Sequence, residues 1–166
     1  PAGGNITVAY ETEVNAFAPM DAAGTITNTA VVSGGGITPI TVTETIGTES
    51  TPILTITKSV SPVPVTENGT LTYTFLIQNA GSAPADIGTD AVIVDTFNPL
   101  LSNLAVSFNG TAWAETTNYT YDETTGVFTT IAGQITVPAA TYTQNPATGV
   151  WTADPGVSTL VVKGTI

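Results

Sequence analysis

Residues 53–60, with the sequence ILTITKSV, carry the alternation of apolar and polar side chains that decides the fold. Leu54 and Ile56 alternate with threonines, which is the period of a β-strand with one buried face. Continuing the alternation places Lys58 on the same face as Leu54 and Ile56, although the chain has only two basic residues. The other basic residue, Lys163 in STLVVKGTI, shares its parity with threonines. We therefore expect Lys58 to point toward the core and Lys163 to be solvated.

The composition argues against several kinds of function. The chain has 166 residues, 42% of them hydrophobic, which is enough for one or two small packed domains. Its net charge of −11 argues against nucleic acid and anionic membranes as partners. Because cysteine and histidine are absent, disulfides, thiol nucleophiles, Ser–His–Asp catalysis and metal sites built on these ligands are excluded. We expect no enzymatic activity and no cofactor, with an oxygen-ligand Ca²⁺ site at Glu44, Glu49, Asp86 and Asp90 as the open alternative.

Two features of the sequence bear on where the protein is found. It has no run of about twenty apolar residues, so no membrane insertion is expected. Four N-glycosylation sequons begin at Asn5, Asn68, Asn109 and Asn118. Together with the absence of cysteine and the strand-rich composition, they favour an extracellular or cell-surface location.

Short alternating runs separated by turn signals occupy nearly the whole chain, which predicts an all-β fold with an immunoglobulin-like sandwich architecture. The expected strands are residues 6–14, 24–32, 40–46, 53–60, 71–79, 91–97, 104–108, 119–122, 126–130, 134–137, 149–153 and 158–166. Residues 46–52 lack alternation, and Pro52 precedes a new strand. We therefore expect residues 1–48 to be the closing strands of one β-sandwich or a donor-strand segment, 49–52 a linker, and 53–166 the main β-sandwich.

The two ends of the chain share a pattern. GGNITVAYETEV (3–14) aligns with PGVSTLVVKGTI (155–166), with glycine on glycine and apolar residues in the same phase. Chance similarity of two strands is the alternative to a true repeat. If the repeat holds, the sandwich that begins near residue 53 lacks its last strands within this chain. Strands from an adjoining repeat or subunit would then complete it by strand addition.

Residues 53–97 resemble the opening of the conserved repeat domain of bacterial and archaeal surface proteins, catalogued as domain of unknown function number eleven. The matching features are Lys58 after Leu-Thr-Ile-Thr, the strand from Gly69 to Thr74, Asn79 to Ala83 as Asn-x-Gly-x-Ala, and Val92 to Thr96 ending in Asp-Thr. GTITNTAVVSG (24–34) is similar to the closing strand of that family. The chain has Phe97-Asn98-Pro99 where the family usually has Leu-Pro. The resemblance implies a tandemly repeated β-sandwich surface protein that is not an enzyme.

Three polar residues lie in otherwise apolar stripes. Asp95 shares its parity with Ala91 and Ile93, and Asn28 lies among the apolar residues of 24–32. A lysine, an asparagine and a carboxylic acid so placed resemble the set that forms intramolecular isopeptide bonds in pilin domains of Gram-positive surfaces. In that chemistry a neutral amine attacks the amide carbon while a protonated acid polarises the carbonyl and shuttles the proton as ammonia leaves. The alternatives are a plain Lys58–Asp95 ion pair, or a β-bulge that reverses the faces. Because the expected boundary separates Lys58 from Asn28, each would meet its counterpart in a neighbouring unit.

Two functions are compatible with these patterns. The leading prediction is a structural building block of an extracellular fibre, stalk or surface layer that assembles with itself by β-strand complementation, with Lys–Asn cross-links as a further hypothesis. The alternative is an adhesin or carbohydrate-binding module displayed on the cell surface, with a glycan as its partner. Its aromatic platform would use Trp113, Trp151, Tyr119, Tyr121 and Tyr142, although packing is the other interpretation of these side chains.

Overall fold

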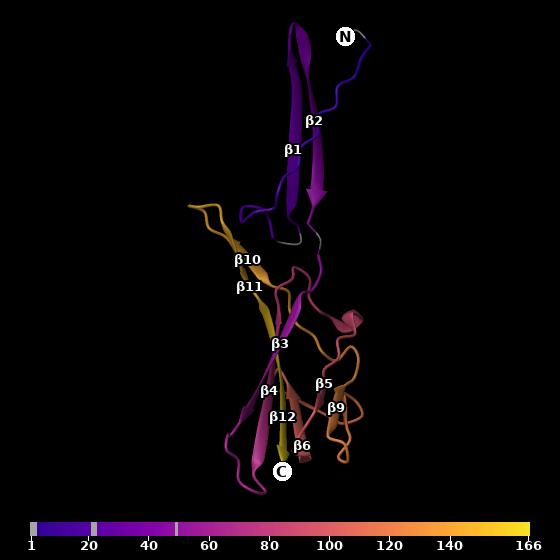
Figure 1. The fold of residues 1–166 in the computed structure, drawn as a ribbon, viewed down its shortest axis with the longest axis vertical. Helices are drawn as coiled ribbons and strands as arrows, with labels where there is room; N and C mark the ends of the chain where they lie inside the picture. The colour runs from indigo at the N-terminus through magenta and orange to yellow at the C-terminus, as the bar shows by residue number, and fades with distance from the viewer. Residues whose placement is uncertain (1–2, 21–22, 49) are drawn as a thin grey trace.

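The computed structural model describes residues 3–20, 23–48 and 50–166, and it confirms the all-β prediction. A hairpin of β1 and β2 extends from one end of an elongated molecule, and the remaining strands form the body at the other end (Figure 1). One short 3-10 helix, η1 (Ile87–Thr89), interrupts the strands. The strands are β1 (Thr25–Gly34), β2 (Ile37–Gly47), β3 (Leu54–Ser61), β4 (Thr70–Asn79), β5 (Val94–Thr96), β6 (Ser102–Phe108), β7 (Thr111–Trp113), β8 (Tyr119–Tyr121), β9 (Val127–Thr130), β10 (Thr141–Gln144), β11 (Trp151–Asp154) and β12 (Gly156–Thr165).

The body contains two sheets that share one hydrophobic core, and a separate two-stranded hairpin of β10 and β11. A five-stranded sheet has the order β3-β4-β12-β6-β7, and a three-stranded sheet has the order β5-β9-β8. The ring centroids of Tyr73 in the first sheet and Phe97 beside the second are 4.7 Å apart, so the core lies between the layers. Its most deeply buried apolar members are Ala85, Phe97, Leu101, Phe128, Ile135, Val137, Leu160 and Val162. This arrangement is sandwich-like.

Strand β12 lies at the centre of the larger sheet, and its sequence explains why. It pairs antiparallel with β4 on one side and with β6 on the other. Leu160 and Val162 are completely buried, while the next residue, Lys163, is exposed. The predicted solvation of Lys163 is therefore confirmed, because alternation places it on the outer face of the sheet.

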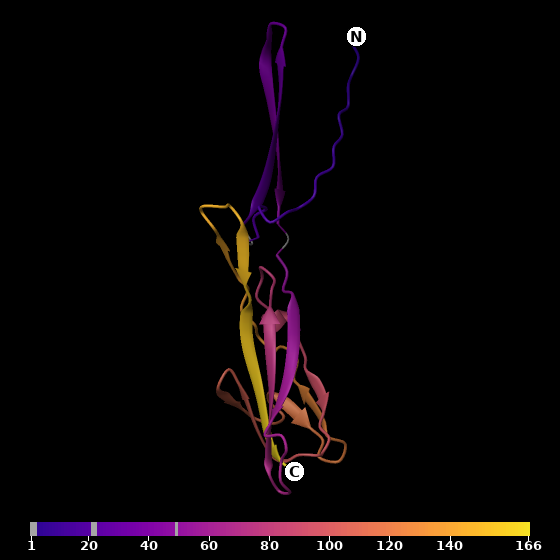
Figure 2. The same cartoon turned by 60° about the vertical axis from the view of Figure 1, so that its left-hand side comes forward.

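The β1–β2 hairpin has one threonine face and one apolar face. Across the threonine face, the hydroxyls of Thr27 and Thr45 are 3.3 Å apart and those of Thr29 and Thr43 are 3.2 Å apart. The other face combines apolar residues with one polar cross-strand pair, Asn28 opposite Glu44. Its apolar members are Ile26, Ala30, Val32, Ile40, Val42 and Ile46, and every residue of both strands is exposed. No third strand extends this two-stranded sheet within the described part of the chain (Figure 2).

Two expected strands are absent, and two short ones were not predicted. Residues 6–14 form no strand, although they alternate, because their backbone joins no ladder; Tyr10 contacts the hairpin through its side-chain hydroxyl, which accepts from Asn28. Residues 134–137 contribute only an isolated bridge between Ala85 and Val137. Strands β7 and β10 are too short for periodicity to reveal. The aligned ends of the chain thus differ, since 156–165 is a central strand and 3–14 is extended and exposed.

Two similar stretches of sequence form the same turn. In DETTG the amide of Gly126 donates to the carbonyl of Asp122 at 2.7 Å, and in NPATG that of Gly149 donates to Asn145 at 2.7 Å. Both glycines have positive φ, +76° and +72°. Hydrogen bonds from the Thr124 amide and hydroxyl hold the pKa of the Asp122 carboxyl at about 2, below its usual range.

Alanine substitution at these two glycines is expected to separate backbone strain from steric clash. Both positions require the left-handed region that alanine disfavours. A Cβ at Gly126 would also lie 2.4 Å from the Phe97 carbonyl oxygen, whereas at Gly149 the nearest atom is 3.5 Å away. We expect Gly126→Ala to lower the free energy of unfolding by about 2–4 kcal/mol and Gly149→Ala by about 1 kcal/mol. Equal losses in urea denaturation followed by circular dichroism would contradict this.

Candidate functional site

Strand β3 has one free edge, and the hydrogen-bond pattern shows which residues point to it. The Ala80 amide donates to the Ile53 carbonyl at 2.9 Å, and the pairing continues in register through Ser61. Backbone groups alternate in direction along an antiparallel strand. The odd-numbered residues of β3 therefore bond to β4, and the N–H and C=O groups of the even-numbered residues point to the free edge.

The even-numbered side chains of β3 face the space between the two sheets. They pair with the core residues of β4, as Ile56 does with Ile77. They remain exposed, to 51% for Ile56, because the smaller sheet ends at β5 and does not cover them. The result is an apolar groove of about 150 Å³ between the open edges of both sheets, lined by Leu54, Thr55, Ile56, Ile77, Ala91, Val92, Ile93 and Ile135.

Lys58 and Asp95 form an ion pair across this opening. The Lys58 Nζ atom contacts the Asp95 Oδ2 atom, which joins β3 to β5. The side chains are 37% and 18% exposed, respectively. The ammonium also lies 4.7 Å from the ring centroid of Tyr73 and 5.3 Å from that of Phe97. The site is thus a cation held by one carboxylate and aromatic rings, with one side still open to solvent.

The ion pair affects its surroundings. Burial raises the pKa of Tyr73, and the negative charge of Asp95 raises it further. The buried Asp95 Oδ2 accepts no hydrogen bond from other described groups besides its contact with Lys58. Lys58 is therefore the group that compensates this carboxylate.

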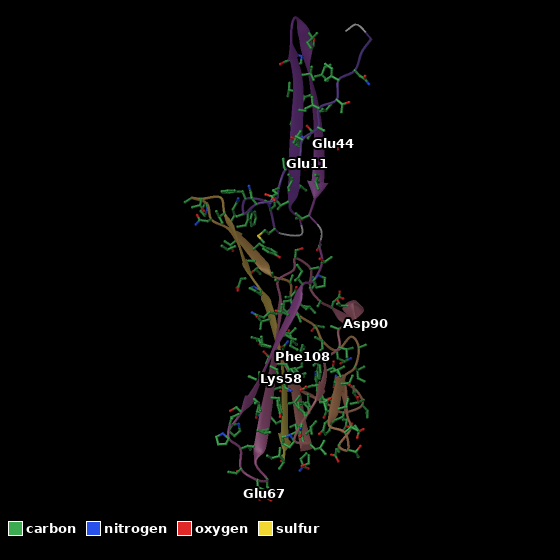
Figure 3. All side chains as sticks on the ribbon, in the orientation of Figure 1. Glu11, Glu44, Lys58, Glu67, Asp90 and Phe108 are labelled. Atoms are coloured by element: carbon green, nitrogen blue, oxygen red, sulfur yellow. The ribbon has the colours of Figure 1, made fainter. Side chains whose placement is uncertain are left out.

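Asn28, the third member of the expected cross-link, lies elsewhere in the same chain. It is on β1 opposite Glu44 and donates to the Tyr10 hydroxyl. Figure 3 shows Glu44 on the extended hairpin and Lys58 in the body, far apart along the molecule. Within a single chain, Lys58 therefore contacts Asp95 but lies far from Asn28.

Asn79 is a further important residue at this edge, and its motif is visible in the sequence. It is completely buried, and its Oδ1 accepts from the amides of Ile53 and Gly81, both at 2.9 Å. Its Nδ2 donates to the carbonyls of Ala83 at 2.7 Å and Pro138 at 3.0 Å. Within the Asn-x-Gly-x-Ala motif, the asparagine thus fixes the start of β3 and the loop that follows β4.

The other predicted site residues do not gather into one site. Among the described residues, no group of three or more acidic side chains could hold a metal ion; Glu49 lies outside the described residues. Asp86 instead caps η1, and Asp90 follows its end. Of the sequon asparagines, Asn5, Asn68 and Asn109 are exposed and Asn118 is half-buried. Asn109 hydrogen-bonds with Ser158 and Thr159, and Asn118 with Ala114 and Gln134.

The aromatic side chains proposed as a platform are divided between core and surface. Trp113 stacks on Phe108, and Tyr119 stacks on Phe128 within the body. Tyr121 packs near Phe97. Trp151 and Tyr142 lie on the separate β10–β11 hairpin, where the Tyr142 hydroxyl donates to the Ala80 carbonyl. Packing therefore accounts for Trp113, Tyr119 and Tyr121.

No family model, curated protein or solved structure compared with this chain matches it. The resemblance to the surface-protein repeat consequently rests on the motifs in residues 24–34 and 53–97. Within the described residues, no helix is long and apolar enough to cross a membrane.

Proposed function

We propose that the chain is a structural building block of an extracellular fibre, stalk or surface layer, in which immunoglobulin-like sandwiches are completed by strands from neighbouring copies. The observation that supports this most strongly is the coexistence of two unsatisfied surfaces in one chain. The β1–β2 hairpin exposes an apolar face, with Ile46 at 68% exposure, and the β3 edge exposes an apolar groove. Unpaired edges beside exposed apolar surface favour association.

The charge distribution is compatible with association through these surfaces. The chain carries −11 overall, which keeps it soluble and opposes random contacts between copies. The apolar face of the hairpin contains a single charged residue, Glu44, and the β3 edge beside the groove carries the cation Lys58. The two surfaces are thus locally complementary although the chains repel each other as a whole.

The proposal includes a covalent form of the junction. The Lys58 amine of one copy would attack the Asn28 side-chain amide of another, forming a C–N bond and releasing ammonia. Asp95, in contact with Lys58, would carry the proton between the amine and the leaving group. If this bond forms, mass spectrometry of the denatured assembly would show linked chains lighter by one ammonia per bond. If the denatured chains separate with unchanged mass, the contact made by Lys58 is ionic and not covalent.

Association can be tested on the whole chain. Light scattering over a range of concentrations is expected to show particles that grow from monomers, and electron microscopy should show regular one-dimensional or layered assemblies. The reason is that each chain offers one donor hairpin and one acceptor edge, which is a head-to-tail contact that does not need to close. A monomer at every concentration, in low and physiological salt, would refute the proposal.

The alternative function, a carbohydrate-binding module, has less support because most of its proposed aromatic platform packs internally. We expect a glycan array probed with the labelled chain to show no specific binding. Saturable binding to one glycan class, lost on Trp151→Ala, would favour the alternative instead.

A further inference from the structure

The hydrogen-bond directions in the hairpin identify which strand can join the β3 edge. The Thr48 amide donates to the Gly24 carbonyl at 3.1 Å, and the β1–β2 register runs from Thr25 opposite Gly47. The even-numbered residues of β1 and β2 therefore bond to each other. The odd-numbered residues point their N–H and C=O groups to the two free edges of the hairpin.

This parity excludes an antiparallel junction with the apolar face turned inward. Residues that bond in an antiparallel pair lie opposite each other with side chains on one face. Outward-pointing groups belong to even residues in β3 and to odd residues in the hairpin, so an antiparallel pair would turn the threonine face toward the groove. In a parallel pair, a residue whose N–H and C=O groups bond to the partner strand lies opposite a residue whose own N–H and C=O groups point away from the junction. Even residues then lie opposite even residues, and the apolar faces match.

We propose that β2 of one copy pairs in parallel with the free edge of β3 of a second copy, with Glu44 opposite Lys58. This deepens the proposed function and rests on it. The register aligns every apolar position and every hydroxyl position: Ile40 with Leu54, Val42 with Ile56, Ile46 with Val60, Thr41 with Thr55, Thr43 with Thr57 and Thr45 with Ser59. The equivalent parallel register of β1 would place Gly24 opposite Leu54 and Val32 opposite Pro62, so it loses apolar contact at both ends.

The partner must be a second copy because the chain is too short to make the contact with itself. Parallel neighbours need a crossover of about a dozen residues or more. Only residues 48–53 connect β2 to β3. Ile53 is moreover already fixed by hydrogen bonds to Asn79 and Ala80.

Electrostatics select this register among those that keep the faces aligned. A slip of two residues would place Lys58 opposite Val42 or Ile46 and Glu44 opposite an apolar residue of β3. In the aligned register, Lys58 lies between Asp95 of its own chain and Glu44 of the second copy. Asn28 lies one strand beyond Glu44, so the ammonium reaches a carboxylate first. The junction in this register is therefore ionic at its centre and apolar on both sides, and a Lys58–Asn28 bond would require pairing through β1 instead.

Proline placement agrees with the register. Pro39 lies at the start of β2, where the β1–β2 register shifts between the Val32–Ile40 and Gly34–Ile37 pairs, so its missing N–H falls outside the part of β2 that would pair with β3. In the aligned register this position lies beyond the first residue of β3, and only the Pro39 carbonyl is required, as an acceptor for the Leu54 amide. The ladder can therefore extend along the length of β3 without a missing donor inside it.

Disulfide trapping tests the register directly, because the chain contains no cysteine. Thr43→Cys and Thr57→Cys are made in separate chains, mixed at a concentration where light scattering shows association, and oxidised mildly. The expected result is a rapid 43–57 linked dimer, since the two Cα atoms of opposed residues lie within disulfide range. Thr43→Cys with Ser61→Cys is the matched control and should link slowly, because the residues are about 13 Å out of register. Thr27→Cys with Thr57→Cys probes pairing through β1, because the equivalent register of β1 places Thr27 opposite Thr57.

The outcomes separate this inference from the proposed function. Equal rates for the 43–57 and 43–61 pairs, or fast linkage of only the 27–57 pair, would overturn the register while leaving assembly intact. Normal association with no 43–57 linkage would do the same. Failure of the unmodified chain to associate at any concentration would defeat both.

Discussion

Glu44→Lys is expected to weaken association of the chains by roughly a hundredfold, because it would place two ammonium groups opposite each other at the β2–β3 junction. Like charges in contact cost several kcal/mol of binding free energy, and each 1.4 kcal/mol changes the affinity about tenfold. The substitution replaces −1 by +1 and so changes the net charge from −11 to −9. Reduced net repulsion alone would strengthen association. The predicted effect therefore has the opposite sign to the general charge effect.

Glu123→Lys provides the matched control, since it makes the same change of charge at an exposed residue in the turn between β8 and β9. It should leave association unchanged or slightly stronger. Glu44→Gln should cause a smaller loss than Glu44→Lys, because it removes attraction without adding repulsion. Sedimentation velocity over a concentration series measures all three variants. Equal association by the Glu44→Lys and Glu123→Lys chains would show that Glu44 does not lie at the junction.

Asn79→Ala is expected to cause the largest loss of stability of any single substitution considered, about 3–5 kcal/mol. The side chain is completely buried and makes four hydrogen bonds to backbone groups of three segments. Alanine would leave two amides and two carbonyls without these partners, and each such buried group costs about 1–3 kcal/mol. Because domains of this size have about 5–15 kcal/mol of stability, the variant should be close to unfolding at 37 °C.

Asn145→Ala is the control for loss of an asparagine that supports a turn. Its Oδ1 atom accepts from the Ala147 amide in an exposed loop, so water can replace it. We expect a loss below about 1 kcal/mol. Urea denaturation followed by circular dichroism compares the two variants. Similar midpoints would contradict the assigned role of Asn79 in fixing the start of β3.

The sequence predicted those strands in which alternation and tertiary burial agree. In β4 and β12, alternation places one face in the core, and the strands lie where expected. Residues 6–14 alternate just as clearly but form no strand, because a strand exists only where another edge accepts its hydrogen bonds. Alternation reports a face that could be buried, and it carries no information on whether a partner is present.

The candidate site could be predicted only in part. Parity placed Lys58 and Asp95 on inward faces, and the structure brings them into contact. The role proposed for Glu44 was missed, because the sequence analysis grouped it with Glu49, Asp86 and Asp90 as a candidate Ca²⁺ site, whereas in the structure it is the charged residue of an apolar face. The direction in which each backbone N–H points depends on which strands already pair, and this information is present only in the fold.

High-resolution cryo-electron microscopy of the assembled chain tests the central claim most directly, because it shows what occupies the β3 edge. The account predicts a β2 strand of a neighbouring copy running parallel to β3, with the Glu44 carboxylate at the level of the Lys58 ammonium. An assembly in which the β3 edge is empty, or is paired with a segment other than the hairpin of a neighbouring copy, would contradict it.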